Sequence, residues 1–112
     1  MRGEQAFLFD MLESCDLVTQ FVAGKTCEQF MADAMLREAV LRRLGIIGEA
    51  ARLVSPATRA KLPDVPWEQI VGMRNVLVHV YFAVKLTTVW DTATRAMSRH
   101  WRRRSAGFWG MQ

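Results

Sequence analysis

A chain of 112 residues is long enough for one domain with a buried core, and it is too short for two. Hydrophobic residues make up 51% and charged residues 23%, which excludes a disordered chain, and no apolar run approaches the roughly 18 residues that span a bilayer. The net charge of +4 is local, because five arginines between residues 95 and 104 leave ten basic against eleven acidic residues elsewhere.

The first half of the chain predicts helices. Apolar residues recur every three to four positions over residues 7–22, as in an amphipathic helix, and Gly24 is placed to end it. Thr26 and Gln29 have the spacing of a capping box, which predicts a short helix next. A long helix is expected over about residues 33–54. Its core-facing side chains are Leu36, Val40, Leu44, Ile47, Ala51 and Val54.

The second half predicts further helices joined by short loops. Ser55 and Pro56 suit the cap and first position of a short helical turn. Another helix is expected to begin at Pro66, and a last helix to cover about residues 86–101. Both Trp67 and Trp90 are expected in the core. The core-facing side chains of the last helix are Val89, Trp90, Ala93 and Met97.

These patterns predict an all-α fold with a single helical domain. It is an up-and-down bundle of about five helices over residues 1–101, followed by a basic and aromatic tail at 102–112. Cys15 and Cys27 follow no metal-site or disulfide spacing, so we expect no metal and no cofactor. The polar residues at the start show no signal-peptide pattern, and we expect a cytoplasmic protein with no membrane partner.

The stretch from Arg74 to Tyr81 carries the candidate chemistry. Arg74 keeps its charge at any working pH and suits phosphate oxygens, and His79 can give or take a proton near neutrality. On a regular helix Asn75 shares a face with His79, and Arg74 shares a face with Tyr81. Asn75 is therefore placed to orient the His79 ring. Glu49, on the preceding long helix, is a candidate ion-pair partner for Arg74.

The stretch from Arg74 to Tyr81, taken together with the segments that surround it, resembles a known protein family. The Arg74-x4-His79-x-Tyr81 pattern resembles the signature of HepT-like proteins, a branch of the HEPN superfamily. Residues 42–51 resemble the family's RRLEIIGEAA segment, and residues 66–75 resemble its PWREIIGLRN segment. The chain departs from the family pattern from Ser98 onward. The similarity covers roughly residues 7–95.

The resemblance implies a function. HepT-like proteins form helical homodimers that act as metal-independent endoribonuclease toxins of type VII-like toxin–antitoxin pairs. Arg74 and His79 would be catalytic, in a cleft between two protomers that receives RNA. A minimal nucleotidyltransferase antitoxin would neutralise the toxin by transferring AMP to Tyr81. The residues themselves also favour a dimer, because metal-free cleavage needs both a base and an acid and the chain offers one suitable histidine.

Other interpretations remain open at the level of sequence. The chain is alternatively a non-catalytic helical binding module, or a scaffold, acting with a nucleotidyltransferase partner. His79 is then a satisfied core histidine and Tyr81 an interface aromatic. The arginines at 102–104 suit either RNA phosphates or a solvated tail.

Overall fold

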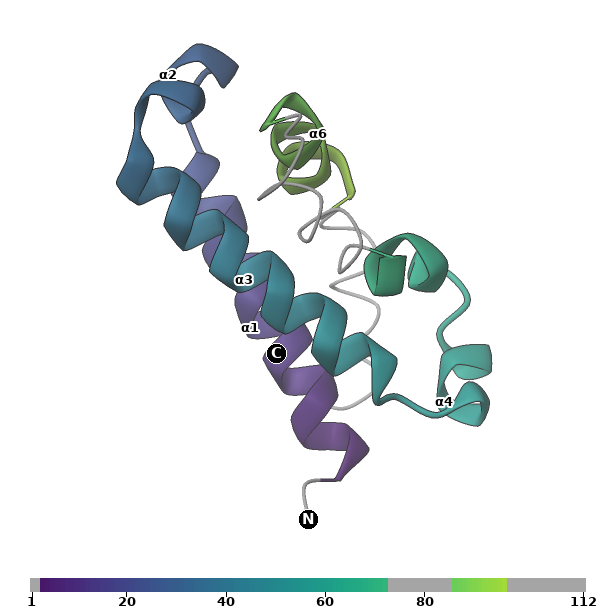
Figure 1. Ribbon diagram of the computed structural model, residues 1–112. Coiled ribbons are helices and arrows are strands. Elements are labelled where there is room, and N and C mark those ends of the chain that lie inside the picture. Colours follow the sequence, from purple (N-terminus) through teal and green to yellow (C-terminus); the bar gives the residue numbers. More distant parts are fainter. Residues whose placement is uncertain (1–2, 73–85, 97–112) are drawn as a thin grey trace.

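The computed structural model describes residues 3–72 and 86–96, and every regular element within them is helical. This confirms the predicted all-α fold. Two long helices, α1 (Glu4–Val22) and α3 (Ala34–Arg52), lie side by side (Figure 1). The shorter elements are α2 (Cys27–Ala32), α4 (Pro56–Lys61), α6 (Leu86–Asp91) and the π-helical turn η1 (Thr92–Ala96), and residues 67–72 are also helical.

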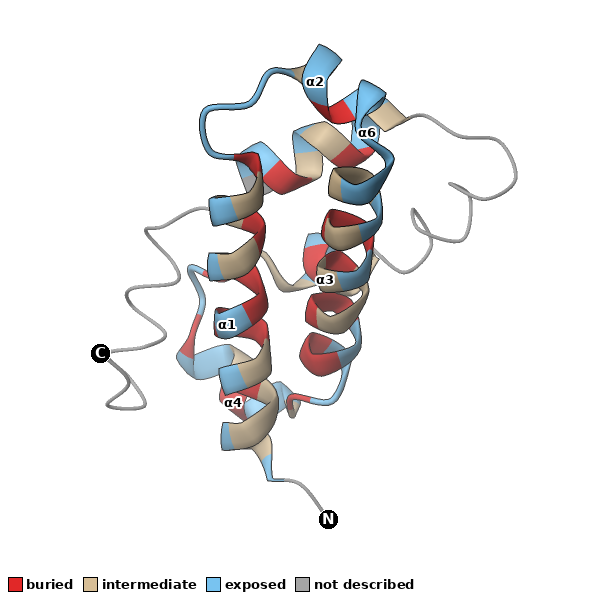
Figure 2. Cartoon of the chain, turned by 90° about the vertical axis from the view of Figure 1, so that its left-hand side faces the viewer, coloured by how far each residue is buried: buried red, intermediate tan, exposed pale blue. Residues whose placement is uncertain are grey.

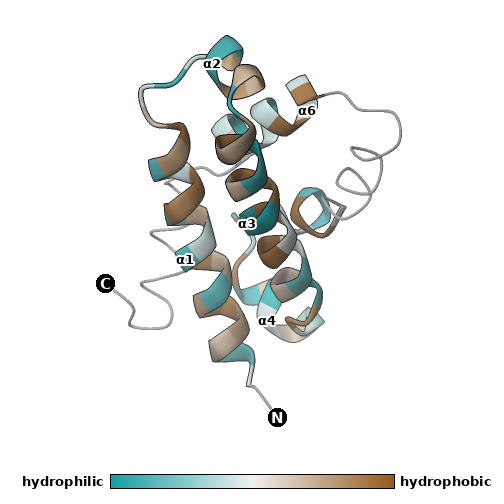
Figure 3. Ribbon diagram, turned by 60° about the vertical axis from the view of Figure 1, so that its left-hand side comes forward, coloured by the Kyte–Doolittle hydropathy of each residue, from teal (hydrophilic) through white to brown (hydrophobic). Residues whose placement is uncertain are grey.

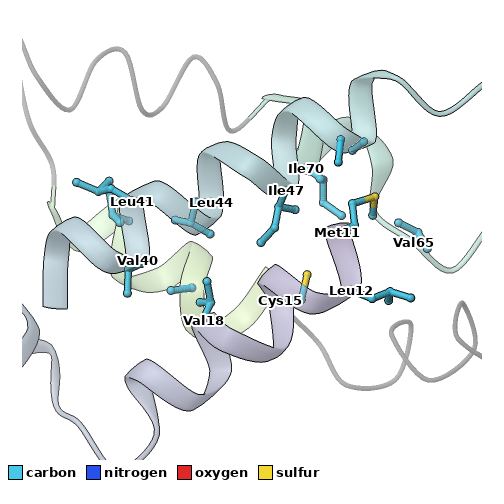
Figure 4. Packing of buried hydrophobic residues seen from close by; sticks show 14 of the residues in the cluster. Met11, Leu12, Cys15, Val18, Val40, Leu41, Leu44, Ile47, Val65 and Ile70 are labelled. Atoms are coloured by element: carbon cyan, nitrogen blue, oxygen red, sulfur yellow. The ribbon is translucent and has the colours of Figure 1, made fainter. Parts of the chain in front are cut away.

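The core lies between α1 and α3. Buried faces of the two helices turn toward each other in Figure 2, and Figure 4 shows Val18, Leu44 and Ile47 among the side chains that fill the space. Those three side chains are at most 1% exposed. Burying a side chain of this size contributes about 1.5–3 kcal/mol, so the pair is held mainly by apolar burial. Polar residues cover much of the outside of both helices (Figure 3).

The end of α1 and the start of α2 follow the sequence signals, and the structure adds a cap at the start of α3. Gly24 has φ of 72°, a left-handed conformation that costs glycine little, and α1 ends just before it. The capping box at α2 is complete, because Thr26 accepts from the Gln29 N–H while the Gln29 side chain accepts from the Thr26 N–H. Asp33 then caps α3 by accepting from the Leu36 N–H at 3.1 Å.

A hydrogen-bonded corner ties the start of α1 to the start of α4. Ser55 caps α4 as predicted, accepting from the Thr58 N–H at 3.2 Å. The Glu4 carboxylate accepts from the Ser55 N–H and, at 2.6 Å, from the Thr58 hydroxyl. Hydrogen bonds from Ser55 and Thr58 lower the pKa of Glu4 below its ordinary value. Residues 51 positions apart in the sequence are thereby joined.

The last helix differs from the prediction of one continuous α-helix from residue 86. After α6 the backbone widens into η1. The Thr92 and Thr94 hydroxyls each donate to a carbonyl four residues earlier, at 2.8 Å, and such bonds bend helices. A second difference is that Trp67 and Trp90 are half-buried at the edge of the core rather than within it. No helix in the described ranges has the length and apolar character needed to cross a membrane.

Candidate functional site

The residues that carry the predicted chemistry fall between two described segments. Arg74, Asn75, His79 and Tyr81 lie outside the described residues, as do the arginines at 102–104. The structure does describe the helical residues that lead into this stretch and the helix α6 that follows it. These flanks show how the chain holds the two ends of the segment that contains the motif.

The segment that leads into the motif is fixed by burial and by one indole. Ile70 is fully buried in the core, and Val65 is 4% exposed. The Trp67 Nε1–H donates to the Leu62 carbonyl at 3.0 Å, closing the turn in front of the helix. The first helical hydrogen bond runs from the Ile70 N–H to the Pro66 carbonyl. The start of the helix that leads to Arg74 is therefore attached to the core.

Arg59 joins this segment to the end of α3. Its guanidinium donates to the Ala51 carbonyl at 3.0 Å and to the Val54 carbonyl at 3.1 Å, in the last turn of α3 and just beyond it. The same guanidinium lies over the Trp67 ring, 5.6 Å from its centroid. Carbonyls at a helix end lack helical donors, and a planar cation satisfies several at once. The sequence analysis missed this residue, since a single arginine in a short helix has no distinguishing pattern.

The segment after the motif is fixed by a second set of contacts. Val89 of α6 is fully buried. The Trp90 ring packs against the buried Phe30 ring of α2, with centroids 5.4 Å apart and planes tilted by 44°. Residues 73–85 thus connect two segments that are each attached to the core.

Glu49, predicted to pair with Arg74, lies on α3 with its side chain 49% exposed. Its Oε2 accepts from the Arg52 Nη2 at 3.0 Å, an ion pair one turn along the same helix. The predicted contact with Arg74 involves a residue outside the described ranges and stays a prediction. Among the described residues, no three histidines, cysteines or acids gather closely enough to hold a metal ion.

Comparison with known proteins shows which family the chain matches. Residues 11–100 match the family described as "Ribonuclease HepT-like". The chain is 43% identical over 89 residues to "Putative RNase MJ1380" of Methanocaldococcus jannaschii, covering 80% of this chain and 82% of that protein. It is 33% identical over 91 residues to "Probable ribonuclease HepT" of Thermococcus cleftensis, covering 81% and 83%.

A third relative, "Putative RNase TTE0752" of Caldanaerobacter subterraneus, is 37% identical over 92 residues, which cover 82% of each chain. No solved structure matches the chain. The family model spans both anchored flanks and the whole stretch between them, including the Arg74-x4-His79-x-Tyr81 pattern. The chain belongs to the HepT-like family of ribonucleases.

Proposed function

We propose that this protein is a metal-independent endoribonuclease whose catalytic residues are Arg74 and His79. The proposal depends on one observation. Arg74 and His79 lie within the part of the chain that matches the ribonuclease family, and the described segments before and after them are attached to the core. Catalytic groups must be held close to one geometry.

The chemistry needs three groups. A base removes the proton of the ribose 2′-hydroxyl, whose oxygen attacks the neighbouring phosphorus. An acid protonates the 5′-oxygen as its bond to phosphorus breaks, and the product is a 2′,3′-cyclic phosphate. His79 serves as base or acid because histidine is the side chain that ordinarily gains or loses a proton near neutral pH. Arg74 binds the phosphate oxygens and stabilises the negative charge that develops on them.

A homodimer completes this set of groups. One protomer supplies a single histidine within the motif, whereas separate acid and base are needed on opposite sides of the phosphate. A twofold axis near the motif brings together two copies of His79 and two of Arg74. The proposal therefore places the RNA-binding cleft between two protomers.

The test is cleavage of a single-stranded RNA by purified protein in the presence of EDTA. We expect His79→Ala and Arg74→Ala each to lose about 10²–10⁴-fold in rate while keeping the helical circular dichroism spectrum of the wild type. Lys25→Ala, at an exposed loop position, is the matched control and should cleave normally. Equal rates for wild type and His79→Ala would refute the assignment. RNA that is bound but never cut would favour the non-catalytic binding module.

Tyr81 is proposed as the point of control. A minimal nucleotidyltransferase would join the Tyr81 oxygen to the α-phosphorus of ATP and release pyrophosphate. The added AMP places a negative phosphodiester two residues after His79, where it competes for the guanidinium of Arg74 and blocks the entry of RNA. The protein would thus act as the toxin of a toxin–antitoxin pair.

Intact-mass spectrometry after incubation with such a transferase and ATP tests this step. The expected result is a mass gain of one AMP group that maps to Tyr81, together with loss of cleavage. Tyr81→Phe should cleave RNA and gain no mass. Neutralisation of Tyr81→Phe through the same covalent modification would contradict the proposal.

A further inference from the structure

An open groove of about 930 Å³ lies along one side of the α1–α3 pair. In the described part of the chain, it is lined by these two helices and by Leu53, which follows α3. The α3 positions Arg42, Ile46 and Glu49 lie on a face roughly opposite the buried Leu44. The groove is therefore separate from the core that holds the two flanks of the motif.

The floor of the groove is apolar. Leu41 and Ala50 form its deepest part and are at most 9% exposed. Phe7 of α1 and Ile46 of α3 are half-buried, and Leu53 is 44% exposed although it is apolar. An apolar side chain placed here would remove part of this surface from water, which is favourable.

The charged side chains of the groove are mainly acidic. Asp10, Glu38 and Glu49 line it together with one base, Arg42. Glu49 also pairs with Arg52, but an ionised carboxylate accepts several hydrogen bonds and can bind a second cation. The groove therefore favours an occupant that combines positive charges with apolar side chains.

The C-terminal tail, residues 102–112, has this combination and lies outside the described residues. It contains three consecutive arginines at 102–104, no acidic residue, and the aromatic residues Phe108 and Trp109. Arginine is the cation best suited to carboxylates, because its planar guanidinium presents several donors at once. The family match ends at residue 100, so the tail is a feature of this chain rather than of the matched family.

The tail is long enough to reach the groove from the last described residue. Ala96 ends η1, and η1 lies against α1, one of the two helices that form the groove. An extended chain advances about 3.3 Å per residue, so residues 97–101 span up to about 17 Å and the tail up to about 36 Å more. Crossing a helix with its side chains takes only about 10–12 Å.

We propose that the C-terminal tail docks in the groove between α1 and α3 of its own chain. The arginines at 102–104 bind the acids of the groove, and Phe108 and Trp109 pack on its apolar floor around Ile46 and Leu53. The arginines are then held by carboxylates of the protein instead of RNA phosphates. This inference depends neither on RNA cleavage nor on the proposed homodimer.

Limited proteolysis of the full-length chain with trypsin is the first test, because trypsin cuts after arginine and a docked segment resists cutting. Glu38→Gln/Glu49→Gln should raise the rate of cleavage at residues 102–104 by about three- to tenfold. Arg42→Gln should lower that rate, because it makes the groove more acidic. Glu28→Gln/Glu68→Gln, at two exposed acids outside the groove, is the matched control and should be cut at the wild-type rate.

Cross-linking locates the tail. Ser105→Cys combined with Ile46→Cys in a Cys27→Ser background should react with a short bismaleimide to give a link within one chain; Cys15 is fully buried. The product should keep the mass of one chain, and peptide mass spectrometry should map the link. Ser105→Cys combined with Lys25→Cys, at an exposed position outside the groove, should give no such link.

Three results would overturn the proposal. Cleavage rates that do not respond to the groove charges would mean that the tail is solvated. Protection that appears only when single-stranded RNA is added would make the tail an RNA-binding arm. A link from Ser105→Cys to Ile46→Cys of another chain would show that the occupant comes from a second copy.

Discussion

The α1–α3 pair and the short elements on either side of the motif differ in how many contacts hold them. The long helices meet through a continuous set of buried apolar side chains, so no single contact decides their pairing. The short helices, such as α4 with six residues, are well below the length at which an isolated helix is stable in water. The short segments depend on a few buried side chains, such as Ile70 and Val89, and on individual hydrogen bonds such as those of Arg59 and the Trp67 indole.

This difference bears on function. A substitution in the long pair should lower the stability of the whole domain, whereas one at Arg59 or Trp67 should also affect how the motif is presented. The four predictions below probe the two regions, from the largest expected effect to the smallest.

The largest effect is expected in the core of the long pair. Ile47→Ala removes a fully buried side chain and leaves a cavity between α1 and α3, which should lower the free energy of unfolding by about 2–5 kcal/mol. Met35→Ala on the same helix is the control, because Met35 is 84% exposed and should change the value by less than about 0.5 kcal/mol. Urea unfolding measures both, and equal costs would mean that the pair is not held by apolar burial.

Arg59 should have the next largest effect. Arg59→Ala removes one donor from each of the Ala51 and Val54 carbonyls and removes the cation from the Trp67 ring, at a cost of about 1–3 kcal/mol. Arg59→Lys keeps the charge but loses the planar fork, and it should recover only part of the loss. Urea unfolding gives the free energies, and the indole N–H resonance of Trp67 reports on the helical residues 67–72 that precede the motif. If the Trp67 resonance were unchanged in Arg59→Ala, Arg59 would not influence the segment that precedes the motif.

A substitution in the capping box of α2 tests how a short helix away from the motif is stabilised. Thr26→Ala removes the acceptor for the Gln29 N–H and should cost about 1 kcal/mol. The cost should appear as a lower Tm in thermal unfolding followed by circular dichroism. Lys25→Ala changes the preceding exposed residue, and its Tm should stay close to that of the wild type. A Tm for Thr26→Ala that matched this control would show that the box contributes nothing.

The smallest effect is a pH dependence at the corner between α1 and α4. The folded-state pKa of Glu4 is lowered, by Ser55 first and then by Thr58. The stabilisation is therefore fully present above the unfolded pKa of about 4.5 and is lost as the pH falls through the lower folded value. The stability difference between wild type and Glu4→Gln should shrink on acidification through this window. Thr58→Val, which removes one donor, should weaken the pH dependence; a difference that grew in acid would contradict the assignment.

Local sequence determined much of the helical framework. The spacing of apolar residues placed α1 and α3, and Gly24 and the Thr26–Gln29 box marked the boundary between α1 and α2. These signals lie within a few residues of the elements that they specify, because helix periodicity and capping are local properties. The Arg74-x4-His79-x-Tyr81 pattern was equally local, and it indicated the family that the comparisons then showed.

Tertiary structure alone decided the contacts between distant residues. Glu4 meets Ser55 and Thr58, and Arg59 spans from α3 to Trp67, because the fold brings those segments together. The π-helical turn after α6 and the half-buried positions of both tryptophans were also absent from the residue pattern. Periodicity states which face of a helix is apolar, but it does not state how much of that face a neighbour covers. That depends on the distance and angle between elements, which arise when the whole chain packs.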